Sequence, residues 1–148
     1  MHTIWDFPYD SPSAISSLLE EHSLAMSKKF GQNFLISEHT LCRITGSLGE
    51  ISDRDVWEIG PGIGALTKQL LLAGARVTAF EIDHGFCRIL RDQAFPGHER
   101  FCLVEGDALK TWPTVFERTG APYAVCGNLP YNVGSVCIAR LLEAQCLP

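Results

Sequence analysis

Hydrophobic and polar positions follow one another along most of this chain in a pattern that predicts short buried strands separated by helices. Strands are predicted at Val56–Ile59, Arg76–Phe80, Phe101–Val104 and Tyr123–Cys126. Helices with one apolar face are predicted at 65–73, 86–93 and 133–144. Parallel strands need such crossover helices, so we expect an α/β fold with a parallel, doubly wound sheet.

We expect residues 1–26 to form a lead-in segment that precedes a main domain at 27–148. Ser11-Pro12 is a favourable helix start because proline fits the first helical position, and one apolar stripe follows at Ile15, Leu18 and Leu19. We expect this short helix to pack on the surface of the main domain. Ser37 can cap a second helix, which carries an apolar face at Leu41, Ile44 and Leu48.

The chain stops at Pro148, directly after the last predicted helix. A four-stranded α/β sheet is small, and its last helix would cover an unfinished edge. We therefore expect the domain to be incomplete, truncated after the fourth strand and its helix.

Composition narrows the class of protein. A length of 148 residues, 46% of them hydrophobic, suffices for one domain with a real core. No apolar run approaches the length of a membrane span, and the N-terminus lacks the order of a signal peptide, so we expect a cytoplasmic protein. The net charge of −5 argues against a protein that binds nucleic acid through its overall charge. Lys28 and Lys29 can still form a local basic patch.

The cysteines do not indicate a metal centre. There are six of them, at Cys42, Cys87, Cys102, Cys126, Cys137 and Cys146. None are spaced as Cys-x-x-Cys, and no cysteine–histidine cluster resembles a zinc site, so we expect no metal and buried, reduced thiols.

A glycine-rich loop, Gly60-Pro61-Gly62-Ile63-Gly64, lies between the first strand and its helix. Glycines let the backbone approach a ligand closely, and a helix N-terminus favours negative charge, so this is a nucleotide-type loop. Two alternatives stay open. Gly60-x-Gly62-x-x-Ala65 also satisfies the dinucleotide fingerprint of NAD proteins, and the loop can cap the helix without any ligand.

Three acids accompany the first three strands. Glu81 follows Gly60 by 21 residues and ends the second strand, a position where an acid can accept hydrogen bonds from ribose hydroxyls. The alternative is a solvated side chain beside Asp83. Asp107, after the third strand, can accept from an adenine amine; otherwise it is a helix cap or turn residue. Glu58 lies inside the first strand, where backbone amides or a cationic ligand group would have to pair it.

The tetrapeptide Asn128-Leu129-Pro130-Tyr131 follows the fourth strand. A side-chain oxygen of Asn128 and a backbone carbonyl can accept both hydrogens of an adenine amine, which frees its lone pair for attack. Pro130, with its fixed φ, can hold the loop carbonyls, and Tyr131 can stack on a base taken out of its helix. The alternative is a proline turn with a buried tyrosine. Ligands bind beyond the carboxyl ends of parallel strands, where all of these features fall.

Five segments together carry a family resemblance, in the order Lys29–Leu35, Glu58–Gly62, Glu81, Gly106–Ala108 and Asn128–Tyr131. Over residues 28–142 the chain resembles the KsgA/Erm family of rRNA adenine N6,N6-dimethyltransferases. Its Lys-Phe-Gly-Gln-Asn-Phe-Leu lead is more similar to the KsgA branch than to the Erm branch. Members of this family continue into further strands, one with another aromatic residue for the target base, and a small helical domain.

The resemblance implies a Rossmann-like fold with S-adenosylmethionine as methyl donor. By motif position it implies that Asn33 and Leu35 contact this cofactor and that Gly60 backs its methionine part. It also implies that Glu81 binds the ribose hydroxyls and that Asp107 meets the adenine amine.

The resemblance likewise implies the catalytic residues. Asn128 would touch both cofactor and target amine, the Leu129 carbonyl would be the second acceptor, and Tyr131, held by Pro130, would stack on the target adenine. The implied substrate is a pair of adjacent adenines in a hairpin near the 3′ end of small-subunit rRNA, within a pre-ribosomal particle. We expect a monomer.

Three alternatives remain open. An Erm-like enzyme would use the same chemistry on large-subunit rRNA. An NAD-dependent oxidoreductase domain would use the glycine loop but leave the Asn128–Tyr131 segment without a role. A non-catalytic ribosome-assembly factor would keep the fold and bind the pre-ribosomal particle without catalysing methyl transfer. Methyltransferases acting on DNA adenine or protein glutamine more often carry a second proline in place of Leu129.

Overall fold

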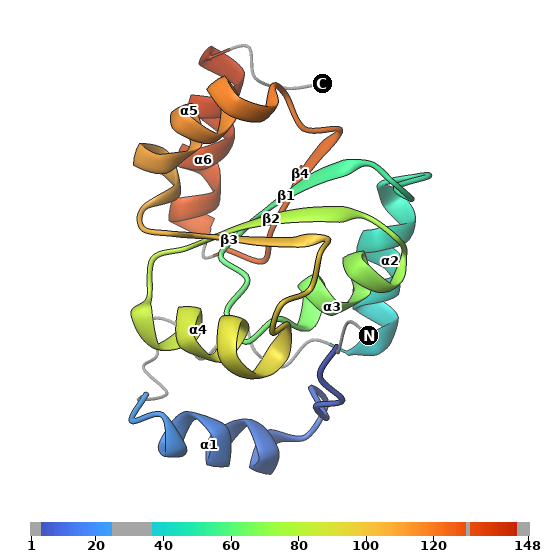
Figure 1. The fold of residues 1–148 in the computed structure, drawn as a ribbon, viewed down its shortest axis with the longest axis vertical. Coiled ribbons are helices and arrows are strands. Elements are labelled where there is room, and N and C mark those ends of the chain that lie inside the picture. The colour runs from blue at the N-terminus through green and yellow to red at the C-terminus, as the bar shows by residue number, and fades with distance from the viewer. Residues whose placement is uncertain (1–3, 25–36, 130, 145–148) are drawn as a thin grey trace.

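The computed structural model describes residues 4–24, 37–129 and 131–144. The predicted basic patch, Asn33, Leu35 and Pro130 lie outside these residues. Four parallel strands form one sheet in the order β3-β2-β1-β4 (Figure 1), with bounds β1 Asp55–Ile59, β2 Arg76–Glu81, β3 Phe101–Glu105 and β4 Ala124–Cys126. The predicted parallel α/β sheet is thereby confirmed.

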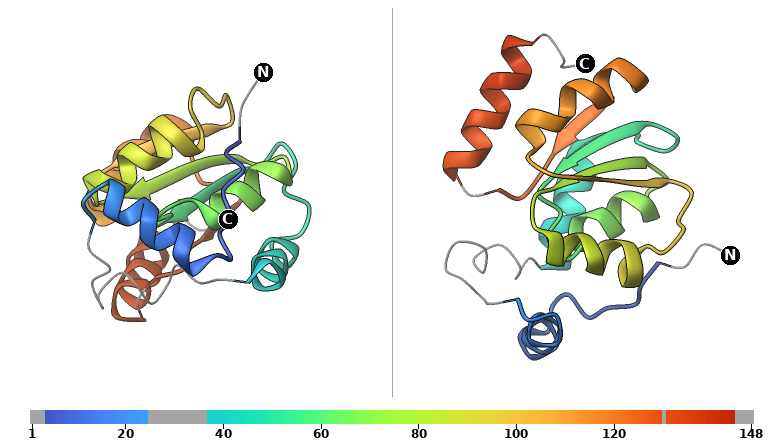
Figure 2. Two further views of the ribbon diagram at one scale, coloured as in Figure 1. Left: turned by 90° about the horizontal axis from the view of Figure 1, so that it is seen from below. Right: turned by 60° about the vertical axis from the view of Figure 1, so that its left-hand side comes forward.

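Helices cover both faces of the sheet. Their bounds are α1 Pro12–Glu21, α2 Glu38–Ser47, α3 Ala65–Leu72, α4 His84–Ile89, its π-helical continuation η2 Leu90–Ala94, α5 Ala108–Thr119 and α6 Tyr131–Glu143. Figures 1 and 2 show α5 and α6 on one face, α2, α3 and α4 on the other, and α1 outside α4. Within the described ranges, no helix has both the length and the apolar character needed to cross a membrane.

The two central strands, β1 and β2, are mostly buried on both faces, as expected of a parallel sheet between two helical layers. Successive residues of β1 therefore serve different cores. Val56 joins the cluster beneath α3 and α4, which we call the first core. Trp57 joins the cluster beneath α5 and α6, which we call the second core. Trp57 packs edge-on against Phe80 of β2, with ring centroids 5.3 Å apart.

The helix of the lead-in segment forms as its sequence predicts. Ser11 caps α1 by accepting a hydrogen bond from the Ala14 N–H at 3.2 Å, and Pro12 opens the helix. The predicted apolar stripe is buried in the first core, at Ile15, Leu18 and Leu19. The segment is thus packed on the main domain. Ser37 caps α2 in the same way, accepting from the Thr40 N–H at 3.2 Å.

Helix α5 was not predicted from the sequence. Pro113 lies inside it and removes one backbone donor, which is unfavourable in a helix interior. The helix forms because Asp107 caps its start and because Val115 is buried against the second core, with Trp112 and Phe116 packed around it. Capping and burial together outweigh the cost of the proline.

Two burial expectations were wrong. Strand β4 is half-buried, not buried, because in the part of the chain described here it pairs only with β1. The five described cysteines are free, as expected, but Cys42 and Cys102 are exposed. Cys42 points away from the inward stripe of α2, and Cys102 lies on the edge strand β3.

Candidate functional site

The carboxyl ends of the strands are held in register at one edge of the sheet. The Gly60 N–H, just after β1, donates to the Phe80 carbonyl of β2 at 2.9 Å. The Gly106 N–H, just after β3, donates to the Glu81 carbonyl at 2.8 Å. These bonds continue the pairing beyond the strands, so the side chains predicted to form a site lie along one edge.

The glycine loop turns sharply between β1 and α3. Gly60 and Gly62 have φ values of +69° and +59°, in the left-handed region that favours glycine. The Gly64 N–H closes the turn by donating to the Pro61 carbonyl at 3.0 Å. Helix α3 then begins with Gly64 at its N-cap, without a side-chain cap. The loop exposes backbone rather than side chains at this edge.

Glu81 connects the end of β2 to this loop. One carboxylate oxygen accepts from the Gly62 N–H at 3.0 Å and the other accepts from the Asp83 N–H at 3.0 Å. The side chain is 5% exposed, so the solvated alternative is wrong. Burial raises the pKa of Glu81 above its usual range, although the backbone N–H groups of Asp83, Gly62 and Ile82 oppose that shift. A carboxylate offers about four acceptor positions, so a hydroxyl can still donate to this one.

Glu58 is a second buried carboxyl, 1% exposed, beneath the same loop. The partner that the structure gives it is the Thr67 hydroxyl of α3, which donates at 2.6 Å and which the sequence did not indicate. Burial raises the pKa of Glu58 to about 8; the Thr67 hydrogen bond opposes this shift and the nearby Glu81 charge adds to it. Glu58 is therefore mainly protonated at neutral pH.

Asp107 lies at the end of β3 and is half-buried. One carboxylate oxygen accepts from the Leu109 N–H at 3.0 Å, so Asp107 is the N-cap of α5. Capping occupies that oxygen and directs the side chain along the start of the helix. The helix-cap interpretation is confirmed, and a contact with an adenine amine through the second oxygen remains a prediction.

The segment after β4 lies directly against the glycine loop. A Cβ atom on Gly60 would lie 2.6 Å from Cδ2 of Leu129, so the leucine side chain covers Gly60. A Cβ atom on Gly127 would lie 2.5 Å from the Ile59 carbonyl oxygen, so only glycine allows the chain to pass the end of β1 this closely. Asn128 and Leu129 are half-buried at this point.

The structure therefore gathers most of the predicted site. Along the edge, the order runs from Asp107 through Glu81 and Gly60 to Leu129 and Asn128. Tyr131 is placed only as the first residue of α6, and its side chain is not described.

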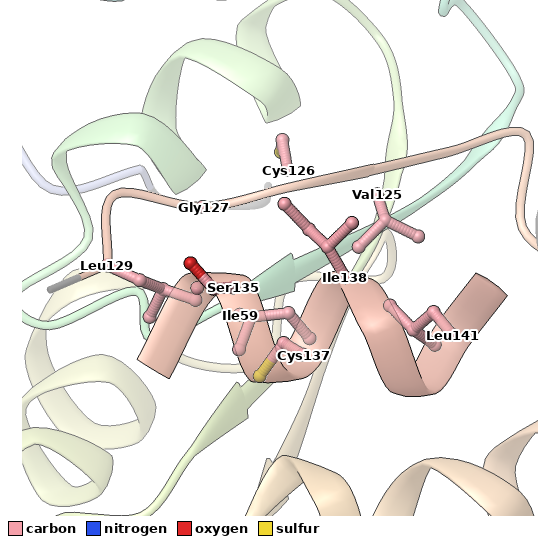
Figure 3. A pocket seen from close by; sticks show the side chains of 10 residues that line it. Ile59, Val125, Cys126, Gly127, Leu129, Ser135, Cys137, Ile138 and Leu141 are labelled. Atoms are coloured by element: carbon pink, nitrogen blue, oxygen red, sulfur yellow. The ribbon is translucent and has the colours of Figure 1, made fainter. Parts of the chain in front are cut away.

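A cavity of about 420 Å³ lies next to this edge, between α6 and strands β1 and β4. Figure 3 shows the side chains that line it, which are mostly apolar, at Ile59, Val125, Cys126, Leu129, Cys137, Ile138 and Leu141, with Ser135 at one end. Among the described residues that line it, none is charged, so its chemistry suits an apolar surface rather than a ribose. It shares Leu129 and Gly127 with the site.

Across the described ranges, no group of histidine, cysteine, aspartate and glutamate side chains is placed to hold a metal ion.

Sequence reasoning missed three residues that shape the site. Thr67 and Tyr9 give no local signal, because their partners Glu58 and Ile63 are brought to them only by the fold. The third residue is Gly127, and its being a glycine directly before Asn128 was the available sign that two backbone segments approach closely there.

Comparison with known proteins assigns these motifs to one group. Residues 24–148 match the family model described as ribosomal RNA adenine dimethylase. The chain is 45% identical over 137 residues to the Ribosomal RNA small subunit methyltransferase A of Treponema denticola, covering 92% of this chain and 47% of that protein. The chain spans about half the length of the curated relatives it matches.

Two solved structures share the fold. The 23S rRNA methyltransferase ErmE is 33% identical, with a TM-score of 0.63, over 76% of this chain and 43% of that one. A dimethyladenosine transferase from Plasmodium falciparum is 27% identical, with a TM-score of 0.59, over 75% of this chain and 38% of that one. The predicted Rossmann-like methyltransferase fold is confirmed by these two structures.

Proposed function

Because this chain belongs to the ribosomal RNA adenine dimethylase family, we propose that it methylates the N6 amines of two adjacent adenines in small-subunit rRNA. These adenines lie in a hairpin near the 3′ end of the RNA, and each takes two methyl groups. The identity of 45% to a relative named for the small subunit supports this subunit over the large one. The chain acts in the cytoplasm, as a monomer, on rRNA within a pre-ribosomal particle.

The contact between Gly60 and Leu129 carries this proposal. It joins the loop on which a cofactor rests to the segment that presents a target amine. A methyl group can move directly only when donor and acceptor are held a few ångströms apart. Cofactor loop and Asn-Leu-Pro-Tyr segment meet at one point of the edge, and this is the arrangement that a direct transfer needs.

The side chains at this edge suit S-adenosylmethionine. Its ribose hydroxyls are donors for the buried Glu81 carboxylate, and its adenine amine is a donor for the half-buried Asp107. The glycine loop between β1 and α3 allows the methionine part to approach the backbone at Gly60. Asn33 and Leu35 contact the cofactor from the segment that precedes α2.

When bound, S-adenosylmethionine supplies a methyl group activated by its sulfonium. Asn128 and the Leu129 carbonyl accept the two hydrogens of the adenine amine, which draws the nitrogen toward a tetrahedral state with its lone pair free. The nitrogen would become cationic on methylation and would then lose a proton to water, so no strong base is needed among the residues of the chain. Pro130 fixes the carbonyl, and Tyr131 stacks on the base, worth roughly 1–3 kcal/mol.

The alternatives are separated by the choice of substrate. The chain is incubated with methyl-labelled S-adenosylmethionine and either small-subunit particles or protein-free large-subunit rRNA, and dimethyladenosine is then measured by mass spectrometry. We expect it in the small-subunit RNA and not after the Asn128→Ala substitution. Product confined to large-subunit RNA would favour an Erm-like enzyme. Support of subunit assembly with no methylation at all would favour a non-catalytic assembly factor.

A further inference from the structure

The lead-in segment, described from residue 4 to residue 24, packs beneath the glycine loop although nearly all of it precedes the part that matches the family model. Its first stretch is tied to η2, where the Trp5 N–H donates to the Ala94 carbonyl at 2.9 Å. Its helix α1 lies outside α4 (Figure 2) and buries its apolar stripe in the first core. The segment is therefore fixed at both ends.

Between these two anchors, Tyr9 reaches the glycine loop itself. Its hydroxyl donates to the Ile63 carbonyl at 2.9 Å, across 54 residues of sequence. Ile63 is 2% exposed, so water cannot easily replace this donor. A buried carbonyl without a donor is costly, and the Tyr9 hydrogen bond is the partner that the structure provides.

The loop is held from three directions. Glu81 accepts from the Gly62 N–H on the β2 side, and the Pro61 carbonyl accepts from the Gly64 N–H inside the turn. Tyr9 donates from below to the residue between these two glycines. With glycine on either side, Ile63 has little local restraint on its peptide orientation, because glycine populates many backbone conformations. The Tyr9 hydrogen bond supplies that restraint.

Tyr9 is itself well placed for this role. It is 8% exposed, its ring packs edge-on against Phe7 with centroids 5.1 Å apart, and the Lys68 ammonium lies 5.9 Å from its ring centroid. Burial, together with the nearby Glu58 carboxyl, raises the pKa of the Tyr9 phenol above its usual value. The hydroxyl therefore keeps its proton and remains a donor throughout the neutral range.

We propose that Tyr9 is a positioning residue for cofactor binding, whose hydroxyl orients the Gly62–Gly64 backbone through the Ile63 carbonyl. This inference rests on the proposed function, since it takes S-adenosylmethionine as the ligand of the loop. It gives the lead-in segment a role beyond packing. The segment raises the affinity of the loop for its ligand by restricting the loop before the ligand arrives.

The test compares Tyr9→Phe with two matched controls. Tyr9→Phe keeps the ring and removes only the hydroxyl. Tyr123→Phe removes a hydroxyl from an exposed tyrosine directly before β4, whose ring lies against Arg54 and not against the loop. Ile15→Val trims the buried face of α1 and so weakens the same segment without touching the Ile63 carbonyl.

Two measurements are made on each variant. Calorimetry gives the affinity for S-adenosylmethionine, and amide hydrogen exchange gives the protection of Gly62 and Gly64 in the ligand-free chain. Loss of one hydrogen bond predicts an affinity about five- to tenfold weaker and faster exchange at both glycines for Tyr9→Phe. Both controls should stay within about twofold of the unmodified chain, the range expected for sites that do not contact the loop.

The proposal is overturned if Tyr9→Phe binds S-adenosylmethionine as tightly as the unmodified chain, or if Ile15→Val weakens binding equally. Absence of binding by the unmodified chain would instead contradict the proposed function, while the exchange comparison, which needs no ligand, would still report on Tyr9. Should Tyr9→Phe fail to fold, exchange of the Tyr9 hydroxyl proton is followed in the unmodified chain. If the Tyr9 hydrogen bond strengthens S-adenosylmethionine binding, bound S-adenosylmethionine must in turn strengthen that hydrogen bond and slow exchange of the hydroxyl proton. An exchange rate that S-adenosylmethionine leaves unchanged overturns the proposal.

Discussion

Replacing Glu58 with glutamine should make the stability of the fold less sensitive to pH. Glu58 is 1% exposed, and burial raises its pKa from 4.5 to about 8 in the folded chain. Glutamine has nearly the same shape, and its side-chain oxygen can still accept from the Thr67 hydroxyl. Glu58→Gln therefore keeps the hydrogen bond and removes only the titration.

The sign and size of the effect follow from linkage. The folded carboxyl binds its proton more tightly than the unfolded one, so its stabilising contribution is complete below pH 4.5 and is lost as the pH rises toward about 8. Each pH unit in that window costs about 1.4 kcal/mol. Between about pH 6 and about pH 8.5, the unmodified chain should lose roughly 2–3 kcal/mol of unfolding free energy more than Glu58→Gln does.

Urea unfolding followed by tryptophan fluorescence measures this difference, because Trp57 is buried in the second core. Both proteins share every other titrating group, so the other contributions largely cancel in the comparison. The exposed Glu50 gives a matched control, and Glu50→Gln should behave as the unmodified chain does. A stability difference between the unmodified chain and Glu58→Gln that stays constant across this pH range would refute the reasoning.

Three further substitutions test the site. Asn128→Ala should abolish methyl transfer while changing the unfolding free energy by only about 1 kcal/mol, and full activity in a methylation assay would remove Asn128 from the mechanism. Glu81→Gln should weaken S-adenosylmethionine binding by about tenfold or more in calorimetry, because it removes a charged acceptor; an unchanged affinity would contradict the ribose assignment. Gly60→Ala should cost about 1–2 kcal/mol in urea unfolding, because its φ is +69° and its new methyl group would displace Leu129. A stability equal to that of the unmodified chain would show that the loop tolerates a side chain there.

The sequence allowed most of the sheet and the order of its motifs to be predicted, because those signals are local. Apolar runs marked the strands, Ser11 and Ser37 marked helix starts, and the glycines at positions 60 and 62 marked the turn. Helix α5 was not predicted, and Pro113 within it is a local signal against a helix. Burial of Val115 against the second core overrides that signal only in the folded chain.

The partners of the buried polar groups could not be predicted, because they depend on tertiary contacts. Glu58 is paired by Thr67 on the far side of the glycine loop, and Ile63 is paired by Tyr9 from a segment 54 residues earlier. Neither pair has a spacing that any local pattern singles out. Asp107 illustrates the opposite case, since an aspartate after a strand and a glycine is often a helix cap or turn residue, and the structure confirms the cap.

The most direct test of the account is calorimetry of this chain with S-adenosylmethionine, with NADH as the competing ligand and Glu81→Gln as the matched variant. The account predicts saturable binding of S-adenosylmethionine, no binding of NADH, and weaker S-adenosylmethionine binding by Glu81→Gln. A folded chain that binds NADH alone, or binds S-adenosylmethionine equally well without the Glu81 carboxylate, would contradict it.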